Sequence, residues 1–234
     1  MLVVREKLPL EAGMHAIIAR NRERWRNNRK EVADPKESYM ELHRRYLDVR
    51  RDIIVELREE HAREHPDEYL TDELDYSEFT FIFGTKDGGF CNSHVNTLGR
   101  YFANILRLSA GQRVIDLGSG FGEQGFTAAL FGATVVCLEI NFHLFQSGLV
   151  LKDVFDDLPG IASVDLRQGD LFVEDISGFD VYLLYFAKDL LEPAVGRVTD
   201  QAGKGAILAL PGTAAKLPDC WRFDERLQAY VRQG

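Results

Sequence analysis

Apolar and polar positions follow two different periods on either side of residue 110. Before it, apolar side chains recur every three or four positions, the spacing that predicts amphipathic helices. After it, short β-branched runs alternate with amphipathic stretches, which predicts strands joined by helices. Strands that alternate with helices form parallel sheets with helices on both faces. We therefore expect an α/β protein with a doubly wound, mostly parallel sheet and an N-terminal helical extension.

The clearest predicted helix covers residues 36–64. Asp34 and Pro35 supply an N-cap and a first-turn proline, and Pro66 ends the helix. Its apolar stripe consists of Tyr39, Leu42, Tyr46, Val49, Ile53 and Leu57. Because the opposite face is charged, we expect the apolar stripe to be buried against another surface. It is either a lid over the core domain or a contact with a second copy of the chain.

The remaining elements are shorter. A short strand or aromatic wall is expected over 79–83, and a helix over 93–108 with Leu98, Phe102, Ile105 and Leu106 inward. Strands are expected over 112–117, 134–139, 163–168, 179–185 and 205–210, helices over 122–131, 142–155 and 188–201, and a closing hairpin over 220–223 and 228–232. We divide the chain into a helical extension, residues 1–75, and an α/β domain, residues 76–234.

Composition narrows the class of protein. The 234 residues are 45% hydrophobic and 28% charged, which is ordinary for a soluble globular protein. No apolar run reaches the roughly 18–20 residues of a membrane helix, and the first residues lack the apolar segment of a signal peptide. The three scattered cysteines suit neither a disulfide framework nor a metal knuckle. We expect a cytoplasmic protein with no membrane contact and no metal site.

The net charge of −9 is distributed unevenly. Residues 1–65 hold 15 basic and 13 acidic side chains, whereas residues 66–234 hold 13 and 24. An acidic domain does not favour binding to a nucleic-acid backbone by bulk electrostatics. The one basic stretch, residues 20–30, is typical of a solvated helix face, although it could also contact phosphate or an acidic partner.

The strongest chemical signal is an apolar strand that runs into a glycine-rich turn. The turn contains Gly118, Ser119, Gly120 and Gly122, and Asp116 stands two residues before its first glycine. Glycines allow backbone conformations closed to other residues and let the backbone approach a ligand closely. Ligands of such folds bind beyond the carboxyl ends of the strands. We therefore expect a ligand site at this turn.

Acidic residues also follow the next two strands. Glu139 lies 17 residues after Gly122, about where a nucleotide-binding βαβ unit places its ribose-diol acceptor. A carboxylate directly after an apolar strand needs a partner, which favours a functional role. Asp170 and Leu171 follow the third strand, where a side chain can meet an adenine edge.

Over residues 110–210 this ordered set resembles the class I S-adenosylmethionine-dependent methyltransferases. The resemblance implies that the backbone at Gly118, Ser119 and Gly120 holds the methionine part of S-adenosylmethionine. It also implies that Asp116 reaches the amino group of that part, directly or through water. S-Adenosylhomocysteine is then the product of the reaction.

The same resemblance assigns the adenosine end of the cofactor. Glu139 is similar to the acidic residue that binds both ribose hydroxyls. Asp170 is similar to the residue that accepts a hydrogen bond from the adenine amine, with Leu171 packed nearby. Tyr185 and Phe186 fall where the family shapes its methyl-transfer site.

Within that family, residues 116–122, 138–139 and 185–187 are similar to the Dot1-like lysine methyltransferases. That subgroup carries an upstream Tyr-Gly-Glu loop, whereas residues 91–94 here read Cys-Asn-Ser-His, so the lysine substrate is not carried over. The Asp/Asn-Pro-Pro-aromatic signature of base amino-group methylation is absent after the fourth strand. The acceptor is therefore an undetermined small molecule or protein side chain.

The implied reaction is a direct displacement at the sulfonium methyl group. The cofactor supplies the electrophile, so the protein mainly positions and desolvates the reactants. If the acceptor is a hydroxyl, amine or thiol, a base that takes its proton contributes about 10²–10⁴-fold. His94 and Tyr185 are the candidate bases. Their alternative roles are a surface or capping histidine and a wall of the cofactor pocket.

Two other functions stay open. The turn also contains the Gly-x-Gly of an NAD(P)-dependent oxidoreductase, but Asp116 stands where those enzymes read apolar-x-Gly, and Asp170 has no role there. The chain could instead be a non-catalytic, cofactor-binding partner protein that acts through residues 1–75. These N-terminal helices are also the candidate contact of a homodimer.

Overall fold

The computed structural model describes residues 10–29, 32, 35–64, 95–185, 188–210 and 217–234. Its helices are α1 (Leu10–Asn27), α2 (Pro35–Glu64), α4 (Val95–Tyr101), α5 (Glu123–Ala129), α6 (Phe142–Val154) and α7 (Lys188–Gln201). Its strands are β1 (Arg113–Leu117), β2 (Thr134–Glu139), β3 (Asp165–Gln168), β4 (Val181–Leu184), β5 (Ile207–Ala209), β6 (Trp221–Asp224) and β7 (Ala229–Arg232). The α/β fold class and the N-terminal helices are as the sequence predicts. The segments expected over 79–83 and around His94 lie outside the described residues.

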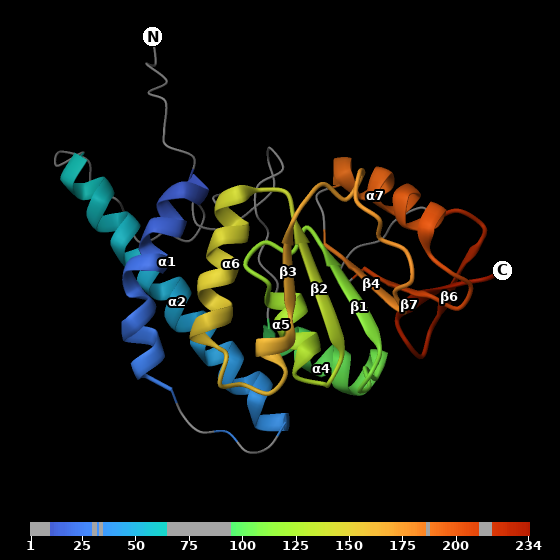
Figure 1. The fold of residues 1–234 in the computed structure, drawn as a ribbon, viewed down its shortest axis with the longest axis horizontal. Helices are drawn as coiled ribbons and strands as arrows, with labels where there is room; N and C mark the ends of the chain where they lie inside the picture. Colours follow the sequence, from blue (N-terminus) through green and yellow to red (C-terminus); the bar gives the residue numbers. More distant parts are fainter. Residues whose placement is uncertain (1–9, 30–31, 33–34, 65–94, 186–187, 211–216) are drawn as a thin grey trace, which may run out of the picture.

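The strands form one seven-stranded sheet in the order β3-β2-β1-β4-β5-β7-β6. The first five pair in parallel, and the closing hairpin of β6 and β7 joins β5 antiparallel. Figure 1 shows α5, α6, α1 and α2 on one side of the sheet and α7 on the other. The doubly wound, mostly parallel sheet is thereby confirmed.

The central strands are apolar on both faces because helices cover both. Along β1, Val114 belongs to the core beneath α5 and α6, whereas Ile115 and Leu117 belong to the core beneath α7. Along β2, Cys137 faces the first core and Leu138 the second. Successive strand residues point to opposite faces of the sheet, and each face is covered by a hydrophobic core. The strand sequences are therefore continuous apolar runs.

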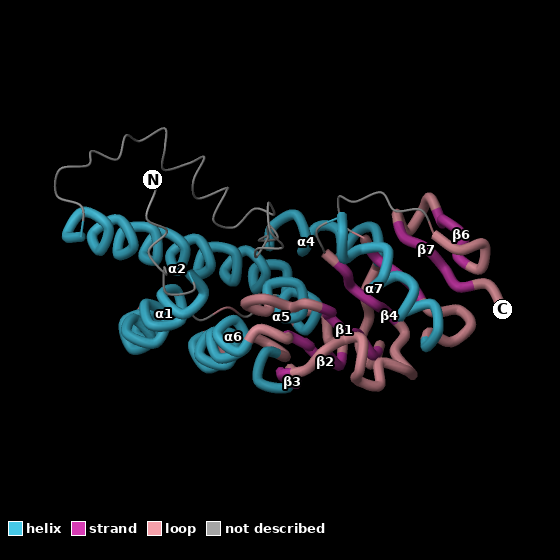
Figure 2. The backbone as a smooth tube through the Cα atoms, turned by 90° about the horizontal axis from the view of Figure 1, so that it is seen from above, coloured by secondary structure: helices cyan, strands magenta, loops and turns pink. Residues whose placement is uncertain are grey.

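The apolar stripe of α2 lies on the rest of the same chain. Leu42, Tyr46, Val49 and Ile53 are buried in the core that also holds α6 and the α5 face of the sheet. The views in Figures 1 and 2 show α1 beside α6 and the long α2 extending past the sheet. Both N-terminal helices are thus part of the main hydrophobic core.

The basic stretch is paired with acidic residues of the same chain. Arg22 Nε donates to Asp153 Oδ2 at 2.6 Å, and Arg29 Nη2 donates to Asp156 Oδ1 at 2.7 Å. Further ion pairs of α1 join Arg20 to Glu56, Arg24 to Asp52 and Arg26 to Asp153. These ion pairs connect α1 with α2 and α6. The helix face that the sequence predicted to be solvated is therefore partly a contact within the protein.

The helix expected over 93–108 is interrupted. An α-helix covers Val95–Tyr101, a π-helical turn covers Phe102–Leu106, and Arg107 takes a left-handed conformation with φ 52°. Leu98, Phe102 and Leu106 are buried as expected, and Ile105 is half-buried. In the described part of the chain, no helix is long and apolar enough to cross a membrane.

Candidate functional site

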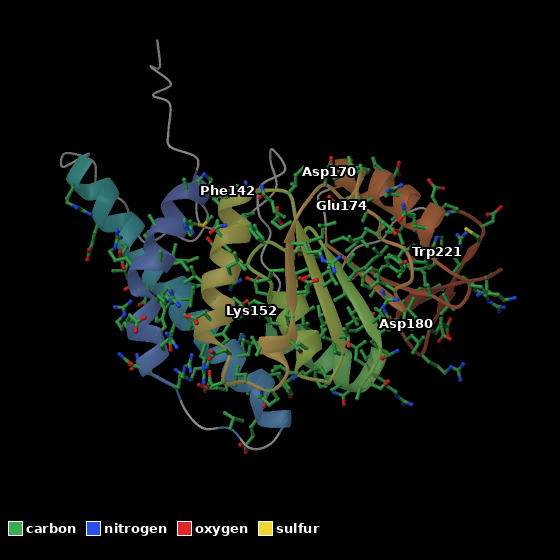
Figure 3. The ribbon with its side chains drawn as sticks, in the orientation of Figure 1. Phe142, Lys152, Asp170, Glu174, Asp180 and Trp221 are labelled. Atoms are coloured by element: carbon green, nitrogen blue, oxygen red, sulfur yellow. The ribbon has the colours of Figure 1, made fainter. Side chains whose placement is uncertain are left out.

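The predicted site residues gather at the carboxyl edge of the central strands. Leu117, at the end of β1, pairs with Leu138 of β2 and with Leu184 of β4. Because β2 and β4 flank β1 on opposite sides, this is the topological switch point where ligands of doubly wound sheets bind. Figure 3 shows Phe142, which begins α6, and Asp170, which follows β3, at this same edge.

The turn after β1 depends on glycine at specific positions. Gly118, Gly120 and Gly122 have φ values of 69°, 55° and 83°, in the left-handed region that disfavours other residues. The amides of Gly118 and Ser119 donate to the Leu138 carbonyl at 2.9 and 3.1 Å. The turn is therefore fixed to the end of β2 by its own backbone.

Asp116 lies fully buried beneath the turn. Its Oδ2 accepts a 2.9 Å hydrogen bond from the Gly125 backbone amide, and its Oδ1 lies 3.4 Å from the Gln124 side-chain Nε2. Burial raises the pKa of Asp116 from its usual value of 3.8 to about 7; the Gly125 hydrogen bond opposes this shift and the nearby Glu139 adds to it. In this structure Asp116 joins β1 to the start of α5.

Glu139 lies at the end of β2 and touches the same turn. Its Oε2 accepts from the Gly120 amide and its Oε1 from the Asn141 amide, both at 2.8 Å. Burial raises the pKa of Glu139, and its backbone hydrogen bonds lower it. A carboxylate has about four acceptor positions, more than these backbone contacts use. Glu139 is therefore placed to position the turn and to accept a further hydrogen bond.

Asp170 begins the loop after β3. Its Oδ1 accepts from the Phe172 amide at 2.9 Å, while its carbonyl accepts from Val173 and Glu174. Leu171 is half-buried and packs against the core beneath α7. Since the amide of Gly169 donates to the Glu139 carbonyl at 3.0 Å, this loop starts beside Glu139.

Of the two candidate bases, the structure describes Tyr185 but not His94. Tyr185 is half-buried and directly follows β4, whose last residue pairs with the last residue of β1, so it lies next to the glycine turn in the sheet. His94 lies outside the described residues. Both remain predictions as bases.

Sequence reasoning missed Glu123, the first residue of α5. Glu123 is 3% exposed, and burial raises its pKa from its usual value of 4.5 to about 8. Its Oε1 and the Ser119 Oγ are buried atoms without a hydrogen-bond partner in the described structure. The available signal was a charged residue directly after the turn, at the start of an apolar helix.

Helix α2 reaches the same turn, which its sequence did not reveal. The buried Tyr46 hydroxyl donates to the Phe121 carbonyl at 2.9 Å. Arg50, one turn further along α2, is close enough to Glu123 to lower its pKa. The N-terminal helix thereby contributes a cation and a fixed contact beside the glycine turn.

The chain is similar in structure to several methyltransferases. No protein-family model matches it. A similar solved structure is the RNA methyltransferase of Salinibacter ruber in complex with S-adenosyl-L-homocysteine, with 26% identity, a TM-score of 0.45, and coverage of 60% of this chain and 90% of that one. A precorrin-6y C5,15-methyltransferase from Geobacter metallireducens GS-15 has 15% identity, a TM-score of 0.43, and coverage of 61% and 69%.

A third similar structure is an S-adenosylmethionine-dependent methyltransferase from Thiobacillus denitrificans, also with S-adenosyl-L-homocysteine. It has 26% identity, a TM-score of 0.39, and coverage of 50% of each chain. All three similar proteins are methyltransferases by name, and these names give no support to the Dot1-like subgroup.

Proposed function

We propose that this protein is an S-adenosylmethionine-dependent methyltransferase that acts on a small molecule or a protein side chain. The observation that carries the proposal is the convergence of Asp116, Glu139 and the glycine turn at the switch point of the sheet. In the described chain, three buried polar atoms at this turn and at the start of α5 lack a hydrogen-bond partner: Ser119 Oγ, Glu123 Oε1 and Gln124 Oε1. Buried polar groups are normally hydrogen-bonded, so these three atoms favour a polar ligand there.

The residues present fit this cofactor. Glu139 keeps acceptor capacity beyond its backbone contacts, which a ribose diol can use. Asp170 and Leu171 supply an acceptor and an apolar surface beyond the neighbouring strand. Gly118 and Gly120 leave the turn without side chains that would block a methionine group. The cofactor, when bound, supplies the electrophilic methyl group.

The described chain contributes mainly positioning. Glu139 fixes the turn through the Gly120 amide, and Asp116 fixes the start of α5 through the Gly125 amide. Tyr185, at the end of β4, is the candidate group to accept a proton from the acceptor or to line its entry. The arginines of residues 20–29 are paired with carboxylates of this chain, so we do not propose a nucleic-acid acceptor.

Calorimetric titration with S-adenosylhomocysteine, with NADH as the comparison, tests the cofactor. We expect binding of the first compound and none of the second. Binding of NADH alone would replace the proposal with the oxidoreductase alternative. The transferase step is then tested with S-adenosylmethionine labelled in its methyl group and a fractionated cell extract. Binding without transfer to any acceptor would leave a non-catalytic, cofactor-binding protein.

A further inference from the structure

We propose that Glu123 binds the carboxylate of the amino-acid part of S-adenosylmethionine, by donating a hydrogen bond from a neutral carboxyl group, with Arg50 of α2 as its cationic partner. This inference rests on the proposed function and assigns a role that the sequence motifs do not give. It also makes the N-terminal helix part of the cofactor site.

The first step is the unsatisfied oxygen of Glu123. Glu123 follows Gly122, the last glycine of the turn, and its Oε1 is buried without a hydrogen-bond partner in the described residues. The Ser119 Oγ, on the turn, and the Gln124 Oε1, on the next residue of α5, are in the same state. An unpaired buried polar atom destabilises the protein, so three of them around one turn favour a polar ligand that satisfies Glu123 and Ser119.

The second step is the charge around Glu123 from each element packed against it. The β1 residue Asp116 raises its pKa, while Arg50 of α2 lowers it. The buried Tyr46 of α2 and Cys137 of β2 also interact with Glu123. Burial raises the pKa of both side chains well above their usual values, so both stay neutral. Burial raises the pKa of Glu123 itself to about 8.

The third step is the chemistry that these groups select. A neutral carboxyl group donates a hydrogen bond, as a hydroxyl does, and a guanidinium group carries a positive charge with donors only. Glu123, Ser119 and Arg50 thus provide three hydrogen-bond donor groups, one of which is positively charged. A carboxylate matches that set, and the only carboxylate of S-adenosylmethionine is on its amino-acid part.

Three ligands separate this role from other roles of Glu123. S-Adenosylhomocysteine carries both the carboxylate and the amine. Its decarboxylated analogue keeps only the amine, and 5′-methylthioadenosine lacks the amino-acid part. For Glu123→Ala we expect the affinity for S-adenosylhomocysteine to fall about tenfold to a hundredfold, the range of hydrogen bonds to charged groups. The affinities for the other two ligands should stay within about twofold, as should all three in Glu192→Gln, an exposed carboxyl on α7.

A pH series on Glu123→Gln tests whether Glu123 binds the ligand in its neutral form. The same variant replaces Glu123→Ala if that variant fails to fold. The Gln amide also donates, so this variant should keep its affinity for S-adenosylhomocysteine within a few-fold at pH 7. Between pH 7 and pH 9 the wild-type affinity should fall about tenfold more than that of Glu123→Gln, since only the wild type loses the Glu123 proton. Asp116 titrates in both proteins, so its contribution is present in Glu123→Gln as well as in the wild type.

Several outcomes would overturn the inference. These are an unchanged affinity for S-adenosylhomocysteine in Glu123→Ala, an equal loss for 5′-methylthioadenosine, or a loss for the decarboxylated amine. A wild-type affinity that rises with pH would also overturn it, because it would place an ionised Glu123 against the ligand's ammonium group. If the wild type binds none of the three ligands, the proposed function itself fails.

Discussion

Gly125 is where α5 packs directly against side chains of β1 and β2. A Cβ atom at this position would overlap Cys137 Sγ and lie 3.4 Å from Asp116 Oδ2. The Gly125 amide also donates the 2.9 Å hydrogen bond that holds Asp116. Gly125→Ala should therefore push α5 away from β1 and β2 and stretch that hydrogen bond.

The expected loss of stability follows from three contributions. Overpacking a filled core costs about 1–3 kcal/mol, and weakening a buried hydrogen bond costs about 0.5–1.5 kcal/mol. The greater helix propensity of alanine offsets this loss of stability by up to about 1 kcal/mol. We expect a net destabilisation of about 0.5–3.5 kcal/mol, measured by urea denaturation with circular dichroism. The affinity for S-adenosylhomocysteine should fall as well, since Asp116 shifts with α5.

A double-mutant cycle assigns the effect to the sulfur. Cys137→Ala removes the overlapping atom, so the double variant should be destabilised by about 1–2 kcal/mol less than the two single variants predict together. The matched control is Gly196→Ala in α7, where a Cβ would meet nothing within 4 Å. That variant should be stabilised by up to about 1 kcal/mol. The packing argument fails if Gly125→Ala behaves like Gly196→Ala or if the cycle is additive.

Three further predictions concern the site and its supports. Glu139→Ala should weaken S-adenosylhomocysteine binding by about 1.5–3 kcal/mol in calorimetry, because charge-assisted hydrogen bonds are lost; an unchanged affinity would remove the ribose assignment. The free energy of unfolding should fall by about 2 kcal/mol or more between pH 5 and pH 8. The reason is that Asp116 and Glu123, with pKa values of about 7 and about 8 in the folded protein, hold protons there that the unfolded chain has released. Glu123→Gln should flatten this slope in urea denaturation at each pH, and an identical slope would contradict the linkage. Arg45→Ala should destabilise the fold by about 2 kcal/mol, because buried Arg45 joins Glu41 at 2.9 Å and Asp157 at 2.7 and 2.8 Å. Arg51→Ala, an exposed arginine, should change stability by less than about 0.5 kcal/mol, and equal losses in the two variants would refute the distinction.

The sequence by itself determined the fold class and the bounds of most elements. A doubly wound sheet requires apolar strands and amphipathic helices, and both patterns are local, so they can be read along the chain. The turn around Gly118 was also readable, because a left-handed backbone restricts the residue type at each position. The positions of Asp116, Glu139 and Asp170 at strand ends followed from the same pattern.

Only the tertiary structure decided how distant residues share one environment. The pKa values of Asp116 and Glu123 depend on burial between β1, α5 and α2, which no local pattern encodes. The contact of Tyr46 with the turn joins residues 75 positions apart, and the partners of the basic stretch lie on α2 and α6. Periodicity identifies which face of a helix is buried, but which surface covers that face depends on packing between distant segments.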